Sequence, residues 1–161
     1  MTLRYAEGEG QAWQQGRGDE LEALALRLCD LVERDAAIYD KVVAAKALAP
    51  DDAGARAQLE RAFRDALETP IEMMEACLGG LRLAAAGASQ GVPAHLVCDC
   101  LAGAEALSTA LEDAYLMVRE NAGSMAGGME VEALVLAAGS MRAEGQGLLA
   151  ALRASARVTA R

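Results

Sequence analysis

The sequence predicts an all-α fold, an antiparallel bundle of about four to five long helices. Alanine and leucine dominate a chain that is 53% hydrophobic, and aromatic residues make up only 3% of it. Strand-like runs of valine, isoleucine, threonine and tyrosine are missing, so the composition favours helices packed through small side chains. Apolar residues also recur every three or four positions along most of the chain, as on the buried side of a helix.

The first part of the chain predicts an arm followed by one long helix. Residues 1–18 are rich in glycine and have no sustained period, so we expect a loosely ordered arm there. Asp19 is a good capping residue, and the spacing after it predicts a helix that runs to about residue 48. Pro50 follows and cannot continue a helix, which sets the expected end.

The middle of the chain predicts either one kinked helix or two helices in succession. Asp51 or Asp52 offers a cap, and an apolar stripe continues past Thr69 and Pro70 to about residue 85. Proline is tolerated in the first turn of a helix but removes a hydrogen bond in its interior, so Pro70 either starts a new helix or kinks the old one. The segment GASQGVP at residues 87–93 is the clearest break in the chain.

Two further helices are expected in the last part of the chain. Apolar positions predict them over about residues 94–121 and 129–158. A glycine inside a helix costs about 1 kcal/mol relative to alanine. We therefore expect close helix contact, and with it a homodimer, at the glycines of the last helix, which occupy positions 139, 145 and 147.

Length and charge limit the classes of function. A chain of 161 residues suffices for one well-buried core, so we expect a single domain over residues 1–161. A net charge of −9 and scattered basic residues argue against a nucleic-acid partner. Charged residues interrupt every apolar stretch before it reaches the roughly 20 residues of a membrane span, and the N-terminus lacks a signal pattern. We expect a soluble, cytoplasmic protein without a membrane partner.

The cysteines do not predict a metal site. Cys29, Cys77, Cys98 and Cys100 are scattered on apolar helix faces, where free cysteine commonly behaves as a small hydrophobic residue. Cys98 and Cys100 are two positions apart, and such neighbours on a helix point to nearly opposite sides. Since His95 is the single histidine, we expect no bound metal.

The first helix carries a carboxylate in its apolar stripe. After Leu31, the next helical step falls on Asp35. Burying an ionised carboxylate without a partner costs several kcal/mol, so Asp35 must be paired, hydrogen-bonded, neutral or in contact with a wet pocket. The apolar members of the stripe are Leu21, Leu24, Leu28, Leu31, Ile38, Val42 and Ala45.

Two more polar residues follow Asp35 on the same side of this helix. Tyr39 and Lys46 lie four and eleven positions further on. The rise of a helix separates Asp35 from Lys46 by roughly 16 Å, which suits an elongated ligand. The alternative is that Asp35 bonds a neighbouring helix while Tyr39 and Lys46 lie at the solvent edge of the stripe.

The helix expected over residues 94–121 has an acid near its start and an amide at its end. Asp99 either contacts a ligand or favours the positive end of the helix dipole, where acids gain roughly 0.3–1 kcal/mol. Asn121 is equally suited to a ligand contact and to a C-terminal cap. Both residues are therefore candidates for ligand binding.

Three segments resemble the cyclodeaminase/cyclohydrolase family, helical enzymes that act on one-carbon derivatives of tetrahydrofolate. RDAAIYDKVVAAKALAP resembles the family's segment of aspartate, A-x-x-A and proline. ALETPIEMME is similar to its alanine, glutamate, valine, proline, leucine stretch, and CDCLAGAEALSTALEDAYLMVREN resembles its serine-aspartate helix with a final asparagine. The resemblance covers roughly residues 20–125, with the segments in the family's order.

The resemblance implies a reaction and a role for each candidate residue. The reaction is addition of water to a methenyl bridge or loss of ammonia from a formimino group. Asp35 and Tyr39 would be catalytic, Lys46 would hold a ligand carboxylate, and Asp99 and Asn121 would bind the ligand. The tetrahydrofolate derivative would be the substrate, with no tightly bound cofactor.

The chain departs from the family pattern at three places. The family's glycine-rich loop before its first helix has no match in residues 1–18, which implies a member shortened at its N-terminus. Cys98 replaces the serine before Asp99, and Met117 stands where the first asparagine is expected. Besides the folate enzyme, two alternatives stay open: a related protein with another small ligand, and a non-catalytic homodimeric binding or interaction module.

Overall fold

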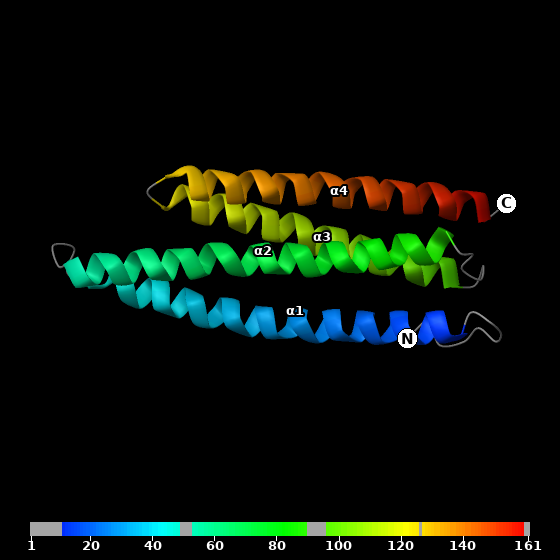
Figure 1. Ribbon diagram of the computed structural model, residues 1–161, viewed down its shortest axis with the longest axis horizontal. Helices are drawn as coiled ribbons and strands as arrows, with labels where there is room; N and C mark the ends of the chain where they lie inside the picture. The colour runs from blue at the N-terminus through cyan, green and yellow to red at the C-terminus, as the bar shows by residue number, and fades with distance from the viewer. Residues whose placement is uncertain (1–10, 49–52, 90–95, 126, 160–161) are drawn as a thin grey trace.

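Four long helices form the structure, which confirms the predicted all-α bundle (Figure 1). The computed structural model describes residues 11–48, 53–89, 96–125 and 127–159, and it contains no strand within these ranges. The part of the expected arm at residues 1–10 lies outside them. The helices are α1 (Gln11–Lys46), α2 (Ala53–Ser89), α3 (Val97–Gly123) and α4 (Met129–Thr159).

The structure corrects one expected boundary and decides between the two alternatives at Pro70. α1 begins at Gln11 and not at Asp19, because two glycines and a capping residue lower helix propensity without preventing the helix from continuing. α2 passes through Thr69 and Pro70 without ending, so this proline is an interior residue. It is tolerated because neighbouring helices satisfy the backbone there, as described below.

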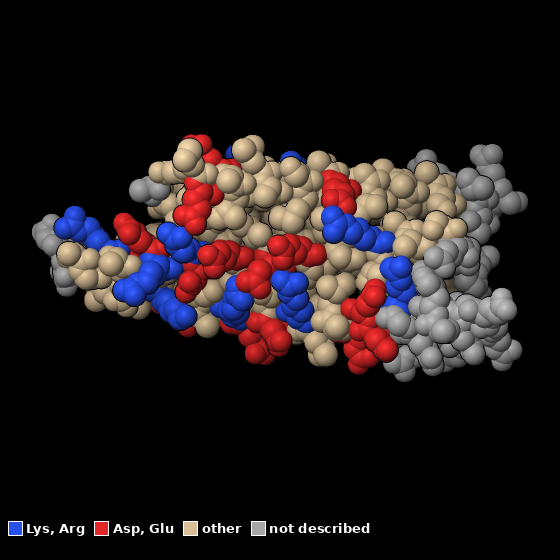
Figure 2. Space-filling model, viewed as in Figure 1, with Lys and Arg blue, Asp and Glu red and all other residues tan. Residues whose placement is uncertain are grey.

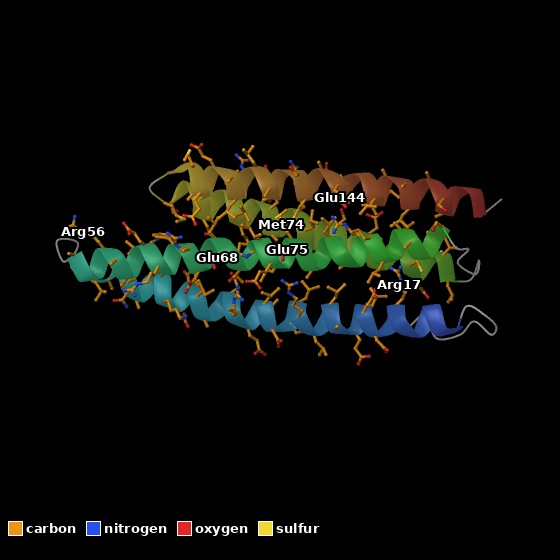
Figure 3. The ribbon with its side chains drawn as sticks, in the orientation of Figure 1. Arg17, Arg56, Glu68, Met74, Glu75 and Glu144 are labelled. Carbon is orange, nitrogen blue, oxygen red and sulfur yellow. The ribbon has the colours of Figure 1, made fainter. Side chains whose placement is uncertain are left out.

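α2 is the central helix of the bundle. It packs against each of the other three helices, whereas α1 packs mainly against α2, and α1 and α4 lie on opposite sides of the molecule (Figure 1). Met74, labelled on α2 in Figure 3, is fully buried, and so are Cys77 and Leu81. These side chains form the main core together with Leu111 and Val118 of α3.

Two contacts fix the register between α1 and α2. A Cβ built on Gly79 of α2 would lie 3.5 Å from the methyl groups of Leu24 on α1. Further along, Arg34 of α1 donates from Nε to Oγ1 of Thr69 at 3.0 Å. Since residue numbers rise along α1 as they fall along α2, the two helices are antiparallel.

Two contacts fix the register between α2 and α3 in the same way. Leu107 of α3 packs closely over Gly80, where a built Cβ would lie 2.7 Å from its Cδ1. Towards the other end, Asn121 of α3 donates from its side chain to the backbone oxygen of Ala66. α3 is therefore antiparallel to α2 and parallel to α1.

Exposed ion pairs join α4 to its neighbours. Glu144, labelled on α4 in Figure 3, accepts two hydrogen bonds from Arg82 of α2, at 2.7 and 2.9 Å. Arg153 of α4 likewise donates twice to Glu105 of α3, at 2.6 Å each. Exposed pairs of this kind contribute about 0–1 kcal/mol, so they support the register more than the stability.

Gly145 accounts for one of the glycines in the last helix. A Cβ built there would lie 3.2 Å from Leu111 and 3.3 Å from Leu81, both fully buried. Overpacking costs about 1–3 kcal/mol, whereas replacing a helical glycine by alanine gains about 1 kcal/mol. We expect Gly145→Ala to lower the free energy of unfolding by about 1 kcal/mol, measured by urea denaturation.

The matched control is Gly103→Ala on α3. No atom lies within 4 Å of a Cβ built on Gly103, so only the gain in helix propensity remains. This variant should be more stable than the wild type by roughly 0.5–1 kcal/mol. Equal stabilisation by both substitutions would contradict the close packing at Gly145.

Candidate functional site

Asp35 occupies the buried seam between α1 and α2. Leu31 and Ile38, one turn before and after it, are each only 3% exposed, while Asp35 itself is half-buried. Within the described residues its carboxylate forms no hydrogen bond and no ion pair. Burial raises the pKa of this carboxyl group above its ordinary value. A carboxylate in this position can exchange a proton closer to neutral pH than an exposed aspartate.

Arg34, the residue before Asp35, is engaged elsewhere. Its Nε donates to the hydroxyl of Thr69, and its guanidinium group also binds the carboxylate of Glu72. The Thr69 hydroxyl in turn donates to the backbone oxygen of Asp65 at 3.1 Å, and Thr69 is fully buried. Arg34 therefore holds α1 against α2 and leaves the carboxylate of Asp35 without a partner.

Asn121 binds the backbone oxygen that Pro70 leaves free. In an α-helix the N–H of residue 70 would donate to the carbonyl of Ala66, but proline has no N–H. The side-chain nitrogen Nδ2 of Asn121 donates to this oxygen at 2.5 Å. The C-cap of α3 is Ser124, so the side chain of Asn121 ties α3 to the interior of α2 instead of capping its own helix.

Asp35 and Asn121 lie at nearly the same level along the bundle. Contacts with α2 show this. Thr69 of α2 contacts Arg34, the residue before Asp35, and Ala66 of α2 contacts Asn121. Thr69 and Ala66 are three positions apart. Three positions correspond to about 5 Å along a helix. The structure therefore places these two candidate residues at one level of the bundle, on two helices, α1 and α3, that each pack on α2.

Tyr39 and Lys46 continue along α1 from this region. The Tyr39 side chain is 68% exposed and begins one helical turn, about 6 Å, beyond Asp35. Lys46 is exposed near the end of α1, and its Nζ lies 5.3 Å from the centroid of the Phe63 ring on α2. A cation over an aromatic face is held by about 0.5–1 kcal/mol at an exposed site.

Asp99 lies far from the other candidate residues. It is exposed in the first turn of α3, whereas Asn121 is in the last turns of the same helix. The rise of a helix separates the two by about 33 Å along the axis. A ligand that touches Asp35 and Asn121 would therefore have to span most of α3 to reach Asp99.

Met117 lies near the level of Asn121, one turn earlier on α3. It lines a shallow depression of about 500 Å³ together with Leu116, Arg119 and Glu120. Asp35 is not among the residues that line this depression. The methionine that stands in place of an expected asparagine therefore contributes apolar surface there.

The sequence analysis missed the contacts around Thr69 and Pro70. The available signal was a hydroxyl residue directly before a proline that interrupts neither the apolar stripe nor the helix. A proline inside such a helix frees one carbonyl, and a partner for that carbonyl must come from elsewhere in the fold. Asn121 could have been considered for this role from that rule alone.

The cysteines differ in their surroundings. Cys77 is buried in the core, and burial raises its pKa to about 11. Cys29 and Cys98 are exposed. The expectation that the cysteines behave as small hydrophobic residues on buried faces is therefore wrong for these two. Among the described residues, no three histidine, cysteine or acidic side chains come together as possible metal ligands. In the same ranges, no helix is both long and apolar enough to cross a membrane.

These features define a helical-bundle protein with an unpaired, half-buried carboxylate near an internal proline. A family model of formiminotransferase-cyclodeaminase matches residues 5–135, most of the chain, and the chain belongs to this family. No curated protein matches the chain. Membership indicates a function related to folate one-carbon chemistry.

The position of Asp35 predicts a dependence of stability on pH. Because its pKa is raised in the folded state, the ionised carboxylate costs stability above that pKa. The cost disappears below the ordinary value of about 3.9, where Asp35 is protonated in both states. We expect Asp35→Asn to be more stable than the wild type at pH 7, with a difference that shrinks towards pH 3.

Urea denaturation at a series of pH values measures this difference. The control is Asp40→Asn, which removes an exposed carboxylate from the same helix and should change stability little. If Asp35→Asn were less stable than the wild type at pH 7, a favourable partner of the carboxylate would be required, and the unpaired state would be wrong.

Proposed function

We propose that the chain acts on a one-carbon derivative of tetrahydrofolate. The reaction is hydrolysis of a methenyl bridge or loss of ammonia from a formimino group. The observation that carries this proposal is Asp35, a half-buried carboxylate without a partner among the residues that the structure describes, in a member of the formiminotransferase-cyclodeaminase family.

Asp35 suits both reactions chemically. In the hydrolysis, water adds to the cationic methenyl carbon, a carbon–nitrogen bond then breaks, and one proton is released. In the ammonia loss, the folate nitrogen that does not carry the formimino group bonds to the formimino carbon and gives up its proton. The bond from this carbon to the imino nitrogen then breaks, and that nitrogen leaves as ammonia after taking up the released proton and one more. A carboxylate stabilises the cationic carbon, and its raised pKa allows it to accept or return the proton.

The other candidate residues would bind the substrate along α1 and α3. Tyr39 would donate a hydrogen bond or orient the substrate beside Asp35. Lys46 would hold a carboxylate of the substrate at the far end, roughly 16 Å from Asp35 along the axis. Asn121 would offer its side-chain oxygen, since its nitrogen is bound to Ala66. Asp99 lies about 33 Å further along α3, too far to contact the heterocycle of the same substrate within one chain.

Assembly and cofactor use form part of the proposal. We propose that the chain works as a homodimer and without a tightly bound cofactor. Tyr39 is 68% exposed and Asp99 is remote, so a single chain leaves much of the proposed binding surface open. The homodimer is supported by α4, where a Cβ built on Gly139 or Gly147 would meet no atom within 4 Å.

The test of the function is direct. Purified protein is added to methenyltetrahydrofolate and, separately, to formiminotetrahydrofolate, and the absorbance of the methenyl form is followed. Loss of that absorbance in the first assay, or its gain in the second, is expected. Binding of either folate without turnover would support a non-catalytic module, while neither binding nor turnover would overturn the folate proposal.

A further inference from the structure

The outer face of α4 is a continuous surface without charged side chains. Met129 is 88% exposed and Leu136 is 73% exposed on this face. In Figure 2 the part of the molecule over α4 is mostly uncharged, unlike the rows of acidic and basic side chains over α1 and α2. The exposed residues of this face, called the α4 stripe here, are Met129, Ala133, Leu136, Ser140, Ala143, Gly147, Ala150 and Ala154.

The α4 stripe has the spacing of a helix that packs against another helix. Its members alternate steps of four and three positions, the heptad pattern of a packed seam. From its first to its last residue it extends for about 37 Å. The core-facing side of α4 carries a separate set of apolar residues, including Ala138, Leu149 and Leu152, so the stripe is a second packing face.

Two residues of the stripe are not explained by packing within the described part of the chain. Gly147 costs about 1 kcal/mol in a helix, yet no atom lies within 4 Å of a Cβ built there, unlike at Gly145. Ser140 donates its hydroxyl to the backbone oxygen of Leu136 and therefore does not depend on water for a partner. Both residues suit a face that another helix approaches closely.

We propose that the α4 stripe binds the α4 stripe of a second copy, antiparallel and about a twofold axis. With Ser140 opposite Ala143 of the second copy, Leu136 faces the gap left by Gly147 of that copy. The same register sets Ala133 opposite Ala150, and Met129 opposite Ala154. Every large side chain of the stripe thus meets a small one, as close packing requires.

The charges beside the stripe agree with this register. Glu132 lies on one flank, and its carboxylate has no partner among the described residues. In the antiparallel arrangement Glu132 comes opposite Arg153 of the second copy, which is 51% exposed and also binds Glu105 of its own chain. Opposite charges at the edge of an interface favour this register and orientation.

The exposed face of α1 fits a second copy less well. It also carries apolar residues, with Val32 and Tyr39 more than half exposed and Val43 nearly so. Its flank, however, bears Glu33 and Asp40. Two antiparallel copies would place these acids opposite each other, which is unfavourable. α4 is therefore the interface of the homodimer. This assignment rests on the homodimer that forms part of the proposed function.

Size exchange tests the register. Sedimentation of the wild type at micromolar concentration should give twice the chain mass of 16.7 kDa. Gly147→Leu should give the single-chain mass, because two leucines would then collide on each side of the twofold axis. Adding Leu136→Ala should restore the dimer, since alanine then faces the new leucine. Gly103→Leu, at an open position on α3, is the control and should remain dimeric.

Disulfide cross-linking tests the same register independently. In a Cys29→Ser/Cys98→Ser background, the double variant Leu136→Cys/Gly147→Cys should form dimers linked by disulfides. Neither single variant should do so, because a residue and its own copy would lie about 16 Å apart along the axis.

The results of these experiments distinguish whether the chain forms a homodimer from whether α4 is its interface. A monomeric wild type would overturn both the homodimer and the α4 interface. A dimer that survives Gly147→Leu and does not cross-link would overturn the α4 interface alone. Turnover of folates, measured separately, does not depend on either result.

Discussion

Replacing Asp35 by asparagine should reduce folate turnover by about 10²–10⁴-fold, the usual contribution of a general acid or base. Asparagine keeps the size of the side chain but cannot exchange a proton or carry a charge. Binding of the folate should weaken far less, because the remaining polar contacts are unchanged. Turnover and binding, measured on the same preparation, separate these two effects.

The pH profile of the wild type provides a second readout. If Asp35 accepts a proton in the reaction, the rate should rise as the pH passes through its raised pKa, and this limb should be absent from the residual rate of Asp35→Asn. Asp40→Asn, an exposed change on the same helix, should behave as the wild type. Full activity of Asp35→Asn would remove Asp35 from the mechanism.

The fold was predictable from the sequence because each helix carries a long apolar stripe. On α1 the stripe residues Leu31, Ile38, Val42 and Ala45 are all buried, as their spacing predicted. The start of α1 was less accessible. Its first turns include Gly16 and Gly18, whose low propensity resembles that of a loop, and a long helix can absorb this cost.

The site was predictable only in part. Asp35 could be found, because an acid in an apolar stripe is visible in a single helix. The level of Asn121 relative to Asp35 depends on how α1 and α3 each pack on α2, and a one-dimensional pattern does not contain this register. The distance of Asp99 from the other candidates depends on the same register.

The family resemblance and the helix contacts both concern the segment around Pro70. The resemblance predicted that the segment around this proline is a family feature, and the structure gives it a physical consequence. A free carbonyl in α2 attracts Asn121 of α3, while Thr69 beside it receives Arg34 of α1. Three helices are thereby fixed at the level of the seam carboxylate, which is where a reaction would need rigid geometry.

Removing the side chain of Asn121 should lower the free energy of unfolding by about 1–3 kcal/mol, because Asn121→Ala leaves the oxygen of Ala66 without a donor. The loss should depend on Pro70. In a Pro70→Ala background, residue 70 regains an N–H that can donate to the same oxygen, so Asn121→Ala should cost clearly less. Urea denaturation of the wild type, both single variants and the double variant measures this coupling.

The cycle is informative because Pro70→Ala alone has opposing effects. It removes a buried ring from the core and returns a backbone hydrogen bond, so its own stability change has no clear sign. The coupling between the two positions cancels these separate terms and should amount to about 1 kcal/mol or more. Thr109→Ala, which removes an exposed hydroxyl bonded within α3, should be equally mild in both backgrounds. Additive losses at Asn121 and Pro70 would show that the amide is held for some other reason, and its side chain would then be more readily available to a ligand.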